Sequence, residues 1–139
     1  MTALDLDKKA GYMELRDVLD ALKKESMCQF PVNILTPSAS GFTIIDWLRN
    51  VNELTQYVHR WIPVASPAIA STVDGLLGQL KGKIDILAIY GDRDSGGKLV
   101  SERLENLCQA QVIEIPGGHP CYFDSPDLFV TSVRSFLGS

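Results

Sequence analysis

One short segment constrains the fold of this chain more than any other, the nearly continuous apolar run IDILAIYG at residues 84–91. A strand that is apolar at consecutive positions is buried on both faces, which is typical of a parallel sheet covered by helices. Parallel strands need long crossover connections, and these are usually helices. We therefore expect strands and helices to alternate along the chain.

The rest of the chain follows this alternation. Apolar runs predict further strands, and spacing of apolar residues by three or four positions predicts amphipathic helices. The expected strands are 30–35, 61–66, 84–91 and 110–116, and the expected helices are 12–25, 42–58, 98–109 and 124–138, with a short helix within 70–82. This order predicts an α/β fold with a mostly parallel sheet and helices on both faces.

Two details refine the prediction. Pro63 lies inside the 61–66 strand, and because proline cannot donate a hydrogen bond, we expect that strand near a sheet edge or a bulge. In the last helix, Ser125 is the expected N-cap, Pro126 the first helical residue and Gly138 the end.

Composition limits the class of protein. A length of 139 residues favours one domain spanning 1–139. The net charge is −4 and no run of Lys or Arg exceeds two residues, which argues against direct binding of nucleic acid. The N-terminus lacks the apolar run of a signal peptide, and no segment reaches the roughly 18 apolar residues of a membrane span.

The three cysteines, Cys28, Cys108 and Cys121, have no metal-like spacing. We interpret them as free thiols in a reducing compartment, and we expect no bound metal or resident cofactor. The expected location is the cytoplasm, with the nucleus as a second one.

Candidate catalytic residues follow three of the expected strands. In LTPSASG, Ser38 lies between a strand and a helix among small neighbours, as a nucleophile on a sharp turn requires, although an ordinary turn explains the pattern equally well. In IYGDRD, Asp92 and Asp94 follow the 84–91 strand, either as solvated turn residues or as the partner of a histidine. In EIPGGHPCYF, two glycines and a proline flank His119.

Together these residues form a consistent set. Ligands gather at the carboxyl ends of parallel strands, and the chain order Ser38, Asp94, His119 is the Ser–Asp–His order of α/β-hydrolases. We therefore interpret Ser38 as the nucleophile, His119 as its general base and Asp94 as the residue that orients His119. The backbone N–H of Ala39 is the expected oxyanion donor.

Three segments of the chain, TPSASG, IYGDRDSGG and GGHPCYFDSPDLF, resemble the α/β-hydrolase domain-containing protein 14 family. The resemblance runs from about residue 15 to the C-terminus, and Thr36 departs from the family's serine. It implies the same three catalytic residues, and it implies removal of acetyl groups from lysine with transfer to coenzyme A, or hydrolysis of small acyl esters. Small acyl substrates or acylated lysines are thus the expected partners.

The resemblance also implies that the family's first strands and its H-G oxyanion loop precede the first residues of this chain. We therefore expect one oxyanion donor to be missing and the chain to self-associate through an exposed sheet edge. A non-catalytic interaction module is the alternative function, and a carrier of small ligands is a third.

Four other side chains are weaker candidates. Ser40 is the second candidate nucleophile, further from the strand end than Ser38. Cys121 is interpreted as a packed thiol, His59 as a structural or surface residue at a helix end, and Asp124 as a turn or capping residue.

Overall fold

The computed structural model describes residues 11–138. The segment 1–10, on which the signal-peptide argument rests, lies outside the described residues. The strands are β1 (Val32–Pro37), β2 (Val58–Val64), β3 (Asp85–Gly91) and β4 (Gln111–Ile115). The α-helices are α2 (Gly11–Lys24), α3 (Phe42–Trp47), α4 (Val51–Tyr57), α5 (Asp74–Leu77), α6 (Ser95–Cys108), α7 (Cys121–Asp124) and α8 (Pro126–Leu137), and the 3-10 helices are η1 (Ser38–Gly41), η2 (Leu48–Asn50), η3 (Pro67–Ser71) and η4 (Gly78–Leu80).

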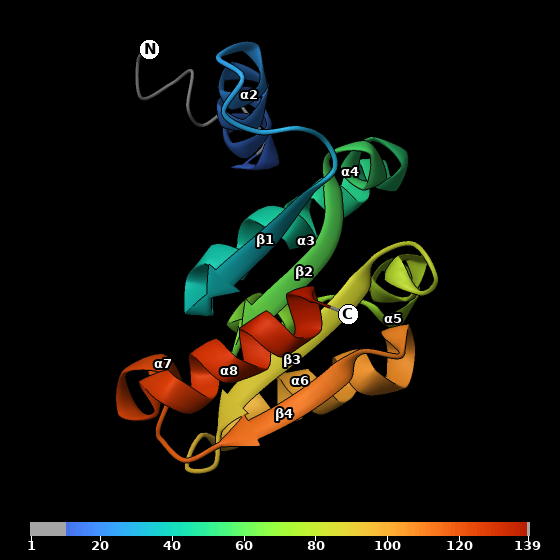
Figure 1. Cartoon of the computed structure of the whole chain (residues 1–139). Helices are drawn as coiled ribbons and strands as arrows, with labels where there is room; N and C mark the ends of the chain where they lie inside the picture. Colours follow the sequence, from blue (N-terminus) through green and yellow to red (C-terminus); the bar gives the residue numbers. More distant parts are fainter. Residues whose placement is uncertain (1–10, 139) are drawn as a thin grey trace, which may run out of the picture.

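The four strands form one parallel sheet in the order β1-β2-β3-β4 (Figure 1). The register sets Leu35 beside Ile62 and Ile89 beside Ile113. All four strands therefore end at the same edge of the sheet, where the candidate residues follow them. The predicted α/β fold with a parallel sheet is confirmed.

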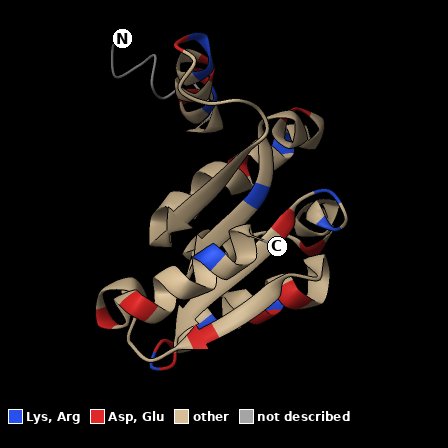
Figure 2. Cartoon of the chain, viewed as in Figure 1, with Lys and Arg blue, Asp and Glu red and all other residues tan. Residues whose placement is uncertain are grey.

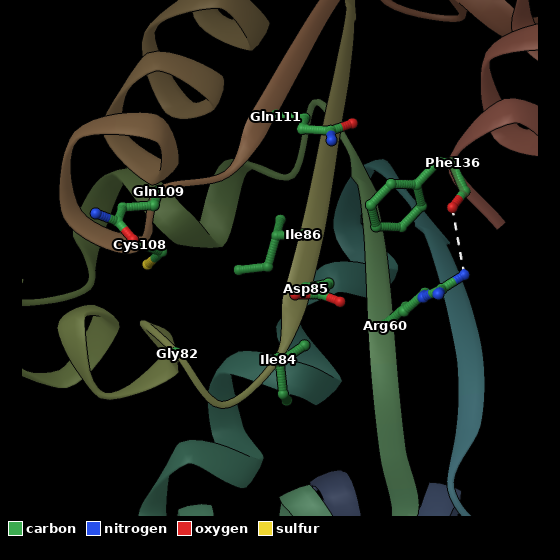
Figure 3. Close-up of a pocket in the computed structure, with 9 residues that line it drawn as sticks. All are labelled: Arg60, Gly82, Ile84, Asp85, Ile86, Cys108, Gln109, Gln111 and Phe136. Carbon is green, nitrogen blue, oxygen red and sulfur yellow. Dashed lines mark hydrogen bonds between the residues drawn. The ribbon is translucent and has the colours of Figure 1, made fainter. Parts of the chain in front are cut away.

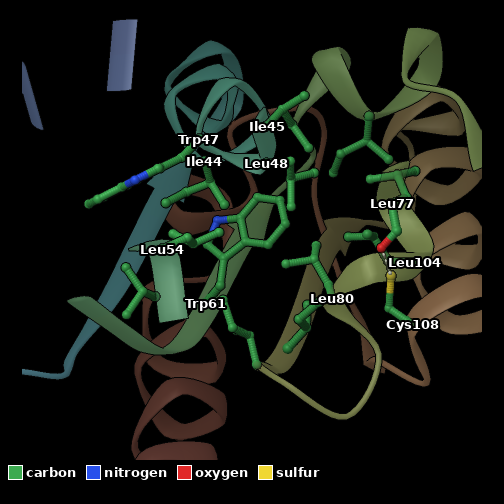
Figure 4. Packing of buried hydrophobic residues seen from close by; sticks show 14 of the residues in the cluster. Ile44, Ile45, Trp47, Leu48, Leu54, Trp61, Leu77, Leu80, Leu104 and Cys108 are labelled. Carbon is green, nitrogen blue, oxygen red and sulfur yellow. Dashed lines mark hydrogen bonds between the residues drawn. The ribbon is translucent and has the colours of Figure 1, made fainter. Parts of the chain in front are cut away.

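Helices cover both faces of the sheet and enclose two separate cores. The larger core lies between the sheet and α3, α5 and α6, and it contains the fully buried Trp47 and Trp61 (Figure 4). The smaller core packs Phe136 of α8 against Ile62, Leu87 and Ile89. β2 and β3 contribute to both cores, which explains the continuous apolar run of residues 84–91.

The sheet edge expected for the strand that contains Pro63 is wrong. β2 lies between β1 and β3, and Pro63 pairs with Thr36 of β1. A proline removes only one N–H from the ladder, and ordinary pairs such as Val64 with Ile89 continue beside it. The bulge-type irregularity expected for this strand is present, but it lies away from Pro63: Val32 pairs with Val58 and Asn33 with Arg60, so His59 is an extra residue of β2 at that point.

The single helix expected over 42–58 is also wrong, because the segment divides into α3, η2 and α4. Asn50 has non-helical backbone angles, and its side-chain oxygen accepts a hydrogen bond from the Glu53 N–H, so it caps a new helix. β2 then begins at Val58, and the exposed His59 lies in that strand rather than at a helix end.

The helix predicted at 12–25 is confirmed as α2, whose Tyr12 ring stacks on Trp47 with 5.4 Å between ring centroids. In the described part of the chain, Lys and Arg are spread over helices, strands and loops among Asp and Glu (Figure 2). No helix within residues 11–138 combines the length and the apolar character needed to cross a membrane.

Candidate active site

Ser38 lies directly after β1, at the first residue of η1, and its backbone φ is +49°. This left-handed conformation is uncommon for a residue with a Cβ and is typical of strained functional turns. The turn also packs closely on the end of β2, since a Cβ at Gly41 would lie 2.3 Å from the Ser66 hydroxyl. A tight, strained turn therefore presents the Ser38 side chain at the carboxyl edge of the sheet.

Hydrogen bonds join Ser38, His119 and Asp94 into one chain. The Ser38 hydroxyl and His119 Nε2 are 2.7 Å apart, and His119 Nδ1 lies 2.8 Å from Asp94 Oδ2. Because an ionised carboxylate can only accept, Nδ1–H donates to Asp94. In the neutral ring the unprotonated Nε2 then accepts from the Ser38 hydroxyl. The structure thus brings together three side chains that follow β1, β3 and β4.

The surroundings of Asp94 favour its ionised form. Partial burial by itself raises the pKa of this carboxyl, but hydrogen bonds from His119 and from the Gly97 N–H outweigh burial, so its pKa is lowered. The Gly97 bond also makes Asp94 the N-cap of α6, which begins at Ser95, three residues before the predicted start. One carboxylate therefore begins a helix and holds the histidine ring.

Backbone hydrogen bonds join the turn after β3 to the loop that carries His119. The Asp92 N–H donates to Ile115 O at 2.9 Å and the Arg93 N–H donates to Gly117 O at 2.8 Å. Asp92 Oδ1 accepts the Gly117 N–H at 3.0 Å, so this carboxylate faces the loop backbone and not the imidazole ring. Asp92 positions the loop, and Asp94 contacts the ring.

Residues that follow His119 in the chain also form hydrogen bonds with the backbone of the same loop. Asp124 Oδ2 accepts the Gly118 N–H at 2.8 Å, as expected for a turn residue. Ser125 occupies the predicted N-cap position of α8, but its hydroxyl donates to the Pro116 carbonyl instead of capping the helix. Sequence reasoning missed this contact, because the partner lies across the loop.

The other candidates do not reach the histidine. The Ser40 hydroxyl donates to Pro37 O at 2.7 Å, within its own turn. Cys121 is fully buried, and burial raises the pKa of its thiol, which leaves little reactive thiolate. Ala39, whose N–H is the predicted oxyanion donor, follows Ser38 in η1 and is exposed.

A small cavity of about 200 Å³ adjoins the histidine and was not foreseen from the sequence. His119 and Asp94 line it, together with residues that include Ala65, Gly97, Leu99 and Val100. Ala65 has the same unusual φ of +49° as Ser38, and Ala65 follows β2. No sequence pattern signals this wall, because it combines residues from the ends of separate elements.

A second cavity of about 280 Å³ lies at the opposite, amino-terminal edge of the sheet (Figure 3). Arg60, Asp85 and Gln111 line it, and the Arg60 guanidinium donates to the Phe136 and Leu137 carbonyls at the end of α8. Ligands of parallel sheets bind at the carboxyl ends of the strands. The site around His119 is therefore the candidate active site.

Sequence comparison finds relatives with a shared name. “Putative protein-lysine deacylase ABHD14B” from Rattus norvegicus is 32% identical over 125 residues, which cover 88% of this chain and 54% of the relative. The human protein of the same name is 30% identical over 124 residues, with the same coverage. The chain spans about half the length of the curated relatives it matches. No protein-family model matches the chain.

Structure comparison finds hydrolases. A predicted CIB-like hydrolase from Thermoplasma acidophilum superposes with a TM-score of 0.70 and 22% identity, covering 91% of this chain and 57% of that one. The type II thioesterase BorB of the borrelidin biosynthetic cluster gives a TM-score of 0.65 and 14% identity, covering 92% and 71%. At these identities the likeness concerns the fold.

The chain therefore has an α/β-hydrolase fold. Within that class it resembles the α/β-hydrolase domain-containing protein 14 family, and the similarity to ABHD14B confirms the resemblance seen in the sequence motifs.

Proposed function

We propose that this chain is a serine hydrolase or acyltransferase acting on small acyl groups. The observation that carries the proposal is the continuous hydrogen-bonded chain from the Ser38 hydroxyl through His119 to Asp94. This arrangement matches the nucleophile, base and orienting acid of serine hydrolases.

In the first half of the reaction, Ser38 Oγ attacks the acyl carbonyl carbon while His119 Nε2 takes the hydroxyl proton. The carbonyl oxygen becomes an oxyanion, and the Ala39 N–H is the proposed donor to it. His119 then gives its proton to the leaving heteroatom, whose bond to the carbonyl carbon breaks, and the acyl group stays on Ser38. Asp94 orients the imidazole and stabilises it while it carries the proton.

In the second half, His119 removes a proton from the acyl acceptor, which attacks the acyl-serine. Water as acceptor gives hydrolysis, and the thiol of coenzyme A, as the family resemblance implies, gives transfer. The bond to Ser38 Oγ breaks, and His119 returns the proton to that oxygen. Removal of small acyl groups from lysine is the proposed activity, supported by the name of the relatives.

Labelling with a fluorophosphonate reagent tests the nucleophile. We expect the reagent to label the wild-type chain, Ser38→Ala to abolish labelling and Ser40→Ala to keep most of it, because the Ser40 hydroxyl is bonded to Pro37 O and not to the imidazole. Labelling that depends on Ser40 would overturn the assignment of Ser38.

A non-catalytic interaction module is the alternative function, and the position of β1 at the open edge of the sheet favours it. The same experiment separates the two functions. An unlabelled but folded wild-type chain would favour the interaction module.

We further propose that the protein resides in the cytoplasm and the nucleus. The free thiols of Cys28, Cys108 and Cys121 fit a reducing compartment. Cell fractionation tests this location, and recovery in a secreted fraction would contradict it.

A further inference from the structure

We propose that a groove along α6 receives the unbranched methylene chain of the substrate's leaving group. The ligand class is an N-alkyl amide or alkyl ester with a polar group beyond the chain, of which an acylated lysine side chain is one example. This inference rests on the proposed function, since it uses the role of His119 to orient the substrate.

Two adjoining cavities form the groove. The first is the cavity of about 200 Å³ beside His119, and the second, of about 320 Å³, extends it along α6. Both are lined by Ala70, Leu99 and Val100, so the two cavities share a wall. We call the two together the α6 groove.

The chemistry of the α6 groove changes along its length. The lining of the cavity that includes His119 is mainly apolar, and Ala65, Pro67 and Leu99 belong to it. At the far end Glu102, Arg103 and Asn106 line it. Such a gradient suits a ligand with methylenes next to the reacting atom and a polar group further away, as in a lysine with its stem of about four carbons and its peptide backbone.

The size of the first cavity favours a thin chain. Sites for drug-sized ligands occupy roughly 300–1,000 Å³, whereas the part beside His119 measures about 200 Å³. A Cβ at Gly97 would lie 2.6 Å from Asp94 Oδ2 and 3.0 Å from the Ala65 Cβ, so the wall is closely packed there. A cavity of this size suits a thin, unbranched chain better than a bulky group.

The position of His119 assigns the groove to the leaving group. His119 lines the first cavity, while Ser38 and Ala39 are not among its lining residues. Since His119 donates its proton to the leaving heteroatom, a substituent on that atom lies nearest the ring. The acyl substituent is attached instead to the carbonyl carbon at Ser38.

The groove is preformed by contacts between η3, α5 and α6. The Arg103 guanidinium donates to the Ile69 carbonyl and to Asp74 Oδ1, which fastens the segment bearing Ala70 against α6. Ala70 and Leu99 are exposed, so substitutions there change the groove without disturbing a core. These two positions are therefore suitable for testing.

Binding of two isomeric amides to Ser38→Ala protein tests the proposal without requiring catalysis. N-butylacetamide carries its chain on the nitrogen, and hexanamide carries it on the acyl carbon. In amide-resolved NMR titrations we expect N-butylacetamide to shift the N–H signals of Ala70, Leu99 and Val100 and to bind more tightly than hexanamide. Each methylene from N-ethylacetamide to N-butylacetamide should strengthen binding about fourfold where it is fully buried.

Matched variants locate the binding. Ala70→Phe fills the shared part of the groove and should weaken N-butylacetamide about tenfold, equivalent to losing burial of more than one methylene. Val73→Phe changes an exposed residue of the same segment that lines neither cavity and should leave binding unchanged.

The opposite results overturn the proposal. Equal or tighter binding of hexanamide would contradict the leaving-group assignment, and absent shifts or an unaffected Ala70→Phe variant would exclude the groove. Failure of the proposed function appears separately, as loss of Ser38-dependent labelling in the wild-type chain.

Discussion

The Asp94 carboxylate holds two groups from different parts of the site, the His119 ring through Oδ2 at 2.8 Å and the Gly97 N–H through Oδ1 at 3.0 Å. Both contacts favour the ionised carboxylate, and they keep the start of α6 and the histidine loop in one arrangement. The stability of the fold and the geometry of the site are therefore connected at this residue.

Asp94 should make the stability of the protein sensitive to acid. Because its pKa is lowered in the folded state, its stabilising contribution is present above the ordinary pKa of an aspartate and is lost as the pH falls through the lowered value. We expect Asp94→Asn to reduce the free energy of unfolding at about pH 7 and to leave a smaller difference from wild type at about pH 3. Urea denaturation at both pH values measures this. An equal loss of unfolding free energy at both pH values would contradict a stabilising role for the charge of Asp94.

Gly91 should tolerate no side chain. A Cβ there would lie 2.2 Å from Gly118 O and 2.4 Å from Gly117 O, both backbone atoms of the loop that carries His119. We expect Gly91→Ala to destabilise the protein by roughly 1–3 kcal/mol, as overpacking does, and to lower the rate of fluorophosphonate labelling because His119 moves. Thermal unfolding and labelling kinetics measure the two effects.

Gly75→Ala is the matched control, because a Cβ at Gly75 in α5 meets no atom within 4 Å. Alanine is the better helix former, so this variant should be neutral or slightly more stable. Equal destabilisation by Gly91→Ala and Gly75→Ala would contradict the prediction that the close packing at Gly91 excludes a side chain.

The three cysteines should differ in reactivity. Cys108 and Cys121 are buried, and burial raises the pKa of Cys121 and raises the pKa of Cys108 to about 11, so neither should react with a thiol reagent in the folded protein. Cys28 is only half-buried. We expect one rapid modification that Cys28→Ser removes, and reaction of all three thiols in denaturant. Rapid modification of Cys121 in the folded chain would reopen it as a candidate nucleophile.

β1 should mediate association between copies of this chain. It lies at the edge of the sheet (Figure 1), and its Leu35 side chain is 39% exposed. Open edges and exposed apolar residues favour pairing with another chain. Size-exclusion chromatography with light scattering should show a dimer or larger species whose share rises with concentration.

Leu35→Lys should shift this equilibrium toward the monomer, because a charge on an edge strand opposes pairing. Val130→Lys, at an exposed position of α8, should leave it unchanged. A monodisperse wild-type monomer at micromolar concentration would contradict the association.

Much of the architecture could be predicted because burial determines the spacing of apolar residues along a strand or helix. Residues 84–91 are apolar at consecutive positions since β3 faces a core on each side, and α2, α6 and α8 show apolar residues at helical spacing since one face of each is packed. The meeting of Ser38, Asp94 and His119 could likewise be predicted, because each follows a strand of one parallel sheet and such strands end at the same edge.

Other features depended on contacts between distant segments. Pro63 is accommodated inside the sheet because both neighbouring strands supply ordinary pairs around it, which no local pattern reveals. The α6 groove likewise combines residues that follow β2 and β4 with residues of η3 and α6. Walls of this kind have no sequence signature.

The amino-acid sequence by itself determined the α/β class, the alternation of elements and the small set of residues that could react. Only the tertiary structure decided that Asp94 contacts the His119 ring while Asp92, two residues before it in the same turn, accepts the Gly117 N–H. The reason is physical: local sequence sets which backbone conformations and buried faces are favourable, whereas hydrogen-bond partners depend on how the loops after β3 and β4 pack together.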